Sequence, residues 1–424
     1  MTDVRSAFLA MAVAALAAPA TFAESLARYN ADPSQVTVSG ISSGAIMAVQ
    51  MHVAYSATFQ GVAAFAGHPY YCGKGDLAVG MATCAQALTA AEINVPELVA
   101  ITRDWASRGW IDDPANLARQ KVYLFSGKLD QTVRPAATEA TRDYYLNFTS
   151  AANITWKGDL DAGHGWISPL GKVLCPLQQS PYINDCQIDP QETFLTLFYG
   201  PLQPKRTGAL SGIFRPVSQA EFIPGGAAAA MSVDENAWLY VPAACERGEL
   251  CKVHVSYHGC AMGYQSIGDA FVRTSGINEW ADTNRIIVLY PQAIRTYPLN
   301  GSGCWDWYAY TGPDFAKKNG AQMLMSKRMI DRITSGFAPV AAPSQVQATN
   351  VSAQNVKLAW APVPGAAGYR VYRDGAAAGE GPVTSPEFSD HALQRNTTYR
   401  YSVRAVAPNG NQGPPSEEVT VTTR

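Results

Sequence analysis

The pentapeptide Gly40-Ile41-Ser42-Ser43-Gly44 constrains the fold of this chain more than any other segment. It follows a strand-like run, residues 36–39, and precedes a helix-like run, residues 45–54. In that context a G-x-S-x-G sequence predicts a sharp strand-to-helix turn that exposes the central serine oxygen. The first N–H groups of the helix would then face developing negative charge. Ser42 is therefore the predicted nucleophile of a serine hydrolase, and the Ser43 N–H is a predicted oxyanion donor. A plain small-residue turn before a buried helix is the alternative.

The position of this turn in the chain predicts an unusual strand order. In the α/β-hydrolase fold, early strands and a His-Gly loop that supplies a second oxyanion donor precede the nucleophile. Here the matching segments lie downstream. Residues 252–257 read as a strand that ends in His258-Gly259-Cys260, and residues 285–290 read as the next buried strand. We therefore expect a circularly permuted α/β-hydrolase domain, which is tolerable because domain termini often lie close together. The Cys260 N–H is the second predicted oxyanion donor.

A serine nucleophile needs a base and an acid that orients the base. His164 lies in a glycine-flanked loop after the strand-like residues 153–156, and such glycines permit a tight loop that carries an imidazole over a serine. Asp130 follows the buried, strand-like residues 121–127 at the edge where open α/β sheets place functional groups. The order Ser42, Asp130, His164 is the nucleophile, acid, base order of this fold. These three residues are the predicted catalytic triad.

Other titratable residues have weaker positions in the sequence. His68 and His258 are the alternatives for the base, because both lie near the predicted active-site edge. Asp159 and Asp161 precede the glycine-flanked histidine in a polar loop, where we expect them to be solvated. The other three of the six histidines fall in a helix, in a strand and in the carboxyl-terminal part of the chain: His52, His254 and His391.

Composition and targeting signals narrow the class of protein. A chain of 424 residues exceeds the size at which one core stops growing, so we expect two domains. A net charge of −2 and only 16% charged residues argue against a nucleic-acid partner. Arg5, an apolar run at 8–18 and small residues up to Ala23 predict a signal peptide over residues 1–23. No later stretch has the roughly 18 apolar residues that a membrane span needs. We therefore expect a secreted protein, either extracellular or periplasmic, that is a monomer.

Eight cysteines in a chain with an export signal predict disulfides. Their grouping predicts three short-range bridges, which leaves one longer bridge by default, although spacing alone cannot prove the pairing. The absence of a C-x-x-C pair argues against a zinc site, so we expect no metal. The predicted pairs are Cys72–Cys84, Cys175–Cys186, Cys245–Cys251 and Cys260–Cys304.

The carboxyl-terminal part of the chain has a different character. The catalytic domain is predicted over residues 24–336, and the Pro/Ala-rich residues 337–343 read as a linker. Residues 344–424 contain strands that alternate as half-buried β-structure and are separated by turns. This module resembles a fibronectin type III domain, with Trp360 in its core and Tyr399 as its tyrosine corner. We expect it to act as a spacer.

Five segments together resemble the permuted ("type 2") catalytic domain of short-chain-length polyhydroxyalkanoate depolymerases. The resemblance covers most of residues 24–336, and the combination is far more specific than any single motif. The segments are Val38-Ser39-Gly40-Ile41-Ser42-Ser43-Gly44, Ser126-Gly127-Lys128-Leu129-Asp130, Gly163-His164-Gly165, Tyr257-His258-Gly259-Cys260 and Cys304-Trp305-Asp306-Trp307.

The resemblance implies a serine esterase that hydrolyses poly(3-hydroxybutyrate), or its oligomers, to short 3-hydroxyacids without a cofactor. It implies that Trp307 lines the substrate crevice, and Trp305 is the second candidate for substrate binding; at least one of them is expected in the core. Extracellular members that degrade crystalline polymer usually have a further binding domain after the linker. Because this sequence ends at Arg424, we expect a preference for oligomers and amorphous polyester.

Two other classes of protein remain open at this point. A feruloyl or acetylxylan esterase would use the same triad, and product analysis on polyester and on feruloylated xylan would separate it. A non-catalytic adhesion or binding protein is favoured only by the fibronectin-like module, and it would not react with a fluorophosphonate.

Overall fold

The computed structural model describes residues 23–424 except 224, 338–339, 409 and 411. The predicted signal peptide lies outside the described residues apart from Ala23, and part of the predicted linker lies outside them as well. Within the described part of the chain, no helix has the length and apolar character to cross a membrane.

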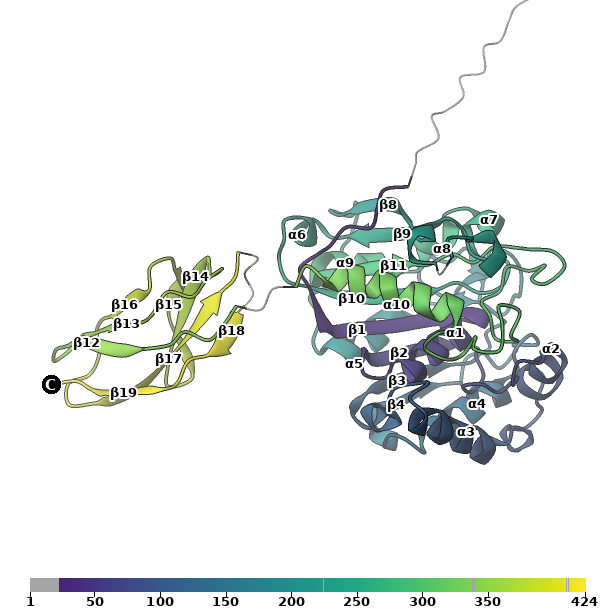
Figure 1. Ribbon diagram of the computed structural model, residues 1–424, viewed down its shortest axis with the longest axis horizontal. Helices are drawn as coiled ribbons and strands as arrows, with labels where there is room; N and C mark the ends of the chain where they lie inside the picture. Colours follow the sequence, from purple (N-terminus) through teal and green to yellow (C-terminus); the bar gives the residue numbers. More distant parts are fainter. Residues whose placement is uncertain (1–22, 224, 338–339, 409, 411) are drawn as a thin grey trace, which may run out of the picture.

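The catalytic domain is built on an eight-stranded sheet (Figure 1). The strand order is β4-β3-β2-β1-β10-β11-β9-β8, in which the strands from β4 to β11 are parallel and β9 runs antiparallel to both of its neighbours. The strands are β1 (Ala31–Ile41), β2 (Phe59–Phe65), β3 (Lys121–Phe125), β4 (Ile154–Lys157), β8 (Ile213–Ser218), β9 (Asn236–Val241), β10 (Cys251–Tyr257) and β11 (Ile286–Tyr290).

This order confirms the predicted circular permutation. If β8 to β11 are read before β1 to β4, then β10 is the third strand, and the loop that follows it is the one that supplies an oxyanion donor in α/β-hydrolases. The first strand, β1, thus lies in the middle of the sheet. The strands β2 to β4 form one half of the sheet, and the strands β8 to β11, which come later in the sequence, form the other half.

Helices cover both faces of the sheet, as a mostly parallel sheet requires. Two hydrophobic cores result, one on each face. The first core contains residues of α1 (Ser43–Ala54), α3 (Val95–Ser107), α4 (Pro135–Tyr145) and α10 (Ala321–Thr334). The second contains residues of α5 (Pro190–Tyr199), α8 (Ala270–Thr274) and α9 (Ile277–Asn284).

Short elements and disulfides complete this domain. A small sheet, β5-β7-β6, consists of β5 (Trp166–Ile167), β6 (Val173–Leu174) and β7 (Ile183–Asp185). The short helical segments are α2 (Leu77–Val79), η1 (Gly80–Ala85), η2 (Ala90–Glu92), η3 (Pro114–Arg119), η4 (Ala151–Asn153), η5 (Ala220–Phe222), η6 (Ala229–Met231), α6 (Ala243–Glu246) and α7 (Tyr264–Ile267). The four predicted disulfides are all present: Cys72–Cys84, Cys175–Cys186, Cys245–Cys251 and Cys260–Cys304.

The carboxyl-terminal module is an antiparallel sandwich with its own core. Trp360 is buried in that core, and the Tyr399 hydroxyl accepts a hydrogen bond from the Gln394 N–H, as a tyrosine corner does. One sheet has the strand order β12-β13-β16. The other has the order β15-β14-β17-β18, and β19 also pairs with β17. The strands are β12 (Gln347–Val351), β13 (Val356–Ala359), β14 (Gly368–Arg373), β15 (Ala376–Val383), β16 (Glu387–Asp390), β17 (Thr398–Val406), β18 (Gln412–Pro415) and β19 (Val419–Thr422).

A close backbone contact sets α1 against β10. A Cβ atom on Gly44 would lie 2.3 Å from the Tyr257 carbonyl oxygen and 2.4 Å from that of His258. We therefore expect Gly44→Ala to lower the free energy of unfolding by several kcal/mol, because neither backbone can retreat from a packed core. Gly301→Ala is the matched control, since its Cβ would meet only the exposed Tyr297 ring at 3.1 Å. Urea unfolding of both variants checks this, and equal midpoints would contradict it.

Two histidines buried in the core make stability depend on pH. His254 lies between Thr37 Oγ1 and Ser39 Oγ, and His52 Nδ1 lies 2.9 Å from the Tyr145 hydroxyl. Burial lowers the pKa of each imidazole from 6.5 to about 3. Below pH 6.5 these imidazoles are protonated in the unfolded chain, but in the folded chain they stay neutral until about pH 3. Their contribution to the free energy of unfolding is therefore complete above pH 6.5 and is lost progressively as the pH falls below that value.

The expected loss is about 1.4 kcal/mol per pH unit for each of these histidines. Urea unfolding between pH 7.5 and 5 measures the slope. His254→Gln should flatten it by about one histidine's share, whereas His391→Gln, an exposed position, should leave it unchanged. Stability that is constant over this range would show the prediction to be wrong.

Candidate active site

Ser42 lies in a strained turn between β1 and α1. Its backbone has φ 58° and ψ −124°, a region that side-chain-bearing residues rarely adopt. The Ser42 N–H donates to the Phe65 carbonyl at the end of β2, which anchors the turn to the sheet. A Cβ atom on Gly40 would lie 2.1 Å from the Gly44 carbonyl oxygen, so the turn requires glycine at both positions. This is the geometry predicted from the pentapeptide.

His164 and Asp130 form a buried pair. His164 Nδ1 lies 2.7 Å from Asp130 Oδ2, and the carboxylate accepts, so the imidazole carries its proton on Nδ1. Asp130 Oδ1 accepts the N–H groups of Thr132 and Val133, each at 2.8 Å. The carboxylate is 1% exposed, which excludes water from the pair. The imidazole therefore has a fixed orientation, with Nε2 left for chemistry.

The loop that carries His164 is fastened to its neighbours. The Gly163 N–H donates to the Cys175 carbonyl, and Cys175 is bonded to Cys186. The Asn184 amide on β7 donates to the carbonyls of Cys175 and Leu177. The small sheet and its disulfide therefore hold the imidazole in place.

Ser42 and His164 line one cavity of about 520 Å³. Ser43, Cys260 and Trp307 line it as well, so the predicted triad serine and base, both oxyanion candidates and one tryptophan meet in one place. Among the described residues, Ser42 Oγ has no hydrogen-bond partner, and such contacts are often long before a substrate binds. Leu77, Met81 and Leu299 extend the wall to the surface, where each is more than a third exposed.

Ser43 and Cys260 line the cavity, and among the described residues their backbone N–H groups have no acceptor. Ser43 is the first residue of α1, whose opening N–H groups have no acceptor within the helix. Cys260 follows β10, and the disulfide to Cys304 ties it to the opposite wall. Within the described chain neither N–H donates a hydrogen bond, whereas the next amide, Ala261 N–H, donates to Ser302. The two amides are thus available to a negatively charged oxygen.

Trp307 is held by the loop around Asp306. The buried Asp306 carboxylate accepts the N–H groups of Tyr308, Tyr310 and Thr311, which folds the loop into a compact turn. Gln322 Oε1 accepts the Asp306 N–H, and Gln50 donates to its carbonyl. These contacts hold the backbone of the loop that carries Trp307, which lines the cavity.

Trp305 does not line the cavity, and its predicted contact with substrate is wrong for this structure. It is completely buried and packs edge-on against Tyr257, with His258 on another side. Its backbone N–H donates to Ser43 Oγ. The segment is not a strand, in which residues 305 and 307 would share a face, and the chain bends from Asp306 onward; Trp305 therefore packs in the core while Trp307 lines the cavity.

The alternative bases, His68 and His258, have no carboxylate partner among the described residues, although His68 Nε2 has no hydrogen-bond partner and His68 lines the cavity. His258 Nδ1 donates to the Gly259 carbonyl, and its Nε2 accepts the Ala293 N–H. His68 Nδ1 donates to the Pro69 carbonyl. Burial lowers the pKa of both imidazoles to about 4. Both serve as neutral structural groups beside the cavity.

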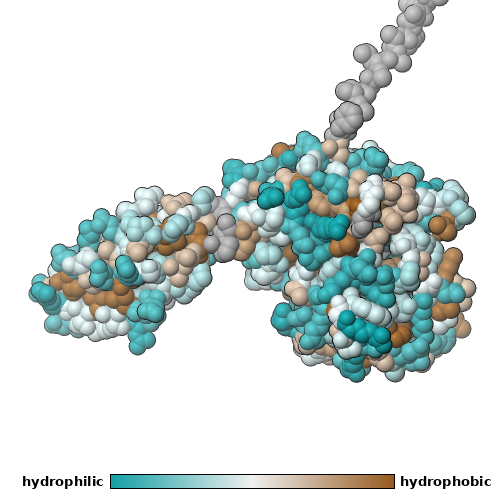
Figure 2. All heavy atoms as spheres, viewed as in Figure 1, coloured by the Kyte–Doolittle hydropathy of each residue, from teal (hydrophilic) through white to brown (hydrophobic). Residues whose placement is uncertain are grey.

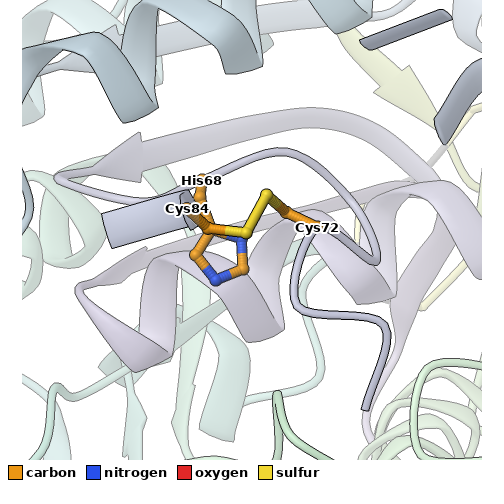
Figure 3. Close-up of side chains that lie close together, drawn as sticks. All are labelled: His68, Cys72 and Cys84. Atoms are coloured by element: carbon orange, nitrogen blue, oxygen red, sulfur yellow. A yellow bond between two sulfur atoms is a disulfide. The ribbon is translucent and has the colours of Figure 1, made fainter. Parts of the chain in front are cut away.

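His68 also lies beside two cysteines in a group with metal-ligand spacing (Figure 3). Cys72 and Cys84 are joined in a disulfide, so their sulfur atoms are not thiolates that could bind a metal ion. The bridge instead fastens η1, which carries Met81, to the loop after His68. This group is a support for the cavity wall.

Sequence reasoning missed other parts of the cavity wall. Leu77, Met81 and Leu299 come from a short helical segment and a loop whose sequences have no distinctive pattern. Tyr182 lies near His164 in the wall and has φ 59°, but no local signal marked it. Figure 2 shows apolar surface at the end of the domain where α2 lies.

Comparison with known proteins gives relatives for both domains. Residues 341–422 match the fibronectin type III domain. A poly(3-hydroxybutyrate) depolymerase of Delftia acidovorans is 40% identical over 394 residues, which cover 90% of this chain and 78% of that protein. A polyhydroxybutyrate depolymerase of Talaromyces funiculosus is 35% identical and covers 76% of this chain and 96% of the relative.

Solved structures agree with these relatives. The PHB depolymerase of Penicillium funiculosum has a TM-score of 0.69 at 34% identity, covering 74% of this chain and 100% of that one. A PHB depolymerase with a serine-to-alanine substitution, complexed with an R3HB trimer, also has a TM-score of 0.69, at 33% identity. The chain belongs to the family of the poly(3-hydroxybutyrate) depolymerases, which are carboxylic ester hydrolases, and it carries a fibronectin type III domain at its carboxyl end.

Proposed function

We propose that this enzyme hydrolyses poly(3-hydroxybutyrate), or its oligomers, through an acyl-serine intermediate. The observation that carries the proposal is the convergence of a strained serine, a carboxylate-oriented imidazole and two unengaged amides on one cavity. Relatives named for activity on this polymer support the substrate class.

In the first half of the reaction, His164 Nε2 takes the proton of Ser42 Oγ as that oxygen attacks an ester carbonyl. The negative charge on the carbonyl oxygen is stabilised by the N–H groups of Ser43 and Cys260. Asp130 holds the imidazole and stabilises its protonated form. Collapse of the intermediate expels the alcohol end of the chain, which takes the proton from His164.

In the second half, water attacks the acyl-serine with His164 as the base. The released product carries a new carboxylate, and repeated cleavage gives short 3-hydroxyacids. The cavity wall suits a methyl-bearing aliphatic ester, since it includes Ile46, Met81, Met262 and Leu299 beside the edge of Trp307.

The proposed location is outside the cytoplasm, either extracellular or periplasmic. Four disulfides support it, because disulfides persist in oxidising compartments. The predicted signal peptide over residues 1–23 is in agreement.

We expect Ser42→Ala to lower ester hydrolysis by about 10⁴-fold or more, because the nucleophile is lost. His164→Ala and Asp130→Asn should also be severe, and double variants should add little because the three residues act as a unit. Initial rates on a soluble 3-hydroxybutyrate oligomer measure this. Turnover within tenfold of the native rate in Ser42→Ala would overturn the triad.

The substrate assignment is tested separately by product analysis on amorphous poly(3-hydroxybutyrate) and feruloylated xylan. Release of 3-hydroxybutyrate units from the first, with no ferulate from the second, is the expected result. The opposite pattern would make the enzyme a carbohydrate esterase with the same triad.

A further inference from the structure

The outer face of the β14–β17 pair in the carboxyl-terminal domain carries three arginines. Inward positions alternate with outward ones, and Val371 and Val403 belong to the core. The outward positions therefore include Arg370 on β14 and both Arg400 and Arg404 on β17. Together with Tyr372 these residues are called the arginine face below.

The strand register puts two of these like charges directly opposite each other. Arg370 pairs with Arg404 across the β14–β17 ladder, where facing Cβ atoms are about 5 Å apart. Like charges in that position destabilise a sheet. Two other basic residues on strands of this domain do have acidic partners, because Lys357 forms an ion pair with Glu387 and Arg373 forms one with Asp390. The Asp374 carboxylate accepts the Arg400 backbone N–H, so the positive charge of the arginine face is concentrated at Arg370 and Arg404.

Within the described chain, no carboxylate forms an ion pair with any arginine of this face. Arg404 lies over the Tyr372 ring, 5.9 Å from its centroid, and donates to the Gly413 carbonyl. The Tyr372 hydroxyl donates to Gln412 Oε1. The face is thus ordered by contacts that leave guanidinium groups available beside an aromatic ring.

We propose that the arginine face binds carboxylate chain ends on the surface of partly hydrolysed polyester. This inference rests on the proposed function, because each ester cleavage adds one water and leaves one carboxylate and one hydroxyl. On a particle, the cut ends stay at the surface. Guanidinium groups bind carboxylates through paired N–H donors, and the tyrosine ring offers an apolar contact to the attached aliphatic chain.

The domain then does more than separate the catalytic domain from its neighbours. It attaches the enzyme to places where cleavage has already occurred, which raises the effective concentration of the catalytic domain at those places. The sequence predicted a spacer, whereas this proposal makes the domain a module that binds polyester surface rich in carboxylate chain ends.

The test uses the full chain with Ser42→Ala, so that the number of carboxylates stays constant during binding. Particles of poly(3-hydroxybutyrate) are partly hydrolysed in alkali, and half of them are then methyl-esterified. We expect tighter adsorption to the carboxylate particles. Arg370→Gln with Arg404→Gln should lower that affinity about tenfold or more and leave adsorption to the esterified particles unchanged. Raising the salt concentration should have the same selective effect.

The matched control is Arg395→Gln with Arg424→Gln, which removes the same charge from exposed positions of this domain outside β14 and β17. It should leave adsorption unchanged, and thermal unfolding should be equal for both double variants. Equal adsorption to the two kinds of particle, or an equal loss in the control, would overturn the proposal. Equally tight binding to phosphatidylglycerol vesicles of matched charge density would also overturn it in favour of a general polyanion site.

Hydrolysis of a soluble oligomer is measured in parallel with Ser42 intact. The two arginine substitutions should leave this rate unchanged, because the arginine face lies outside the catalytic domain. Absence of hydrolysis in the unsubstituted enzyme would count against the proposed function, whereas a lost preference for carboxylate particles in an active enzyme would count against the arginine face alone.

Discussion

The parallel pairing of β1 with β10 holds the two halves of the catalytic domain together. The strands of one half of the sheet precede residue 200 in the chain and those of the other half follow it, and within the sheet order of the described residues β1 and β10 are the neighbours that join the two halves. Gly44 packs against the carbonyls at the end of β10, which brings the serine turn beside the loop that bears Cys260. Without that close contact, the two oxyanion donors would belong to separate surfaces.

Loops around this contact are fastened mainly by polar and covalent links. The Cys260–Cys304 bridge ties the oxyanion loop to the segment that presents Trp307, and Cys175–Cys186 ties the small sheet that supports His164. Buried polar groups also hold each loop in its conformation. The Asp306 carboxylate, for example, accepts hydrogen bonds from three backbone N–H groups. Rigid walls of this kind let the cavity keep its shape before substrate binds.

Much of this arrangement follows from local sequence patterns, and the remainder depends on long-range packing. The serine turn, the strand before Asp130 and the glycine-flanked His164 were predictable because each has a local backbone requirement. The direction in which each tryptophan points was not, since Trp305 and Trp307 have the same local context and only the fold assigns one to the core. The strands β8 and β9 at the sheet edge and the β5-β7-β6 sheet were also missed, because short strands in turn-rich sequence have weak patterns.

The buried histidines differ in the partners of their ring nitrogens, and this difference separates the proposed base from the other candidates. His258 has both nitrogens engaged by backbone groups, and His254 has both engaged by hydroxyls inside the sheet. Burial lowers the pKa of His254 to about 3 and that of His258 to about 4, which favours their neutral forms. His164 differs because its Nδ1 partner is the buried carboxylate of Asp130, which is the arrangement that the proposed mechanism requires. The partner on Nδ1 therefore distinguishes His164, which has a carboxylate there, from His258, which has a backbone carbonyl.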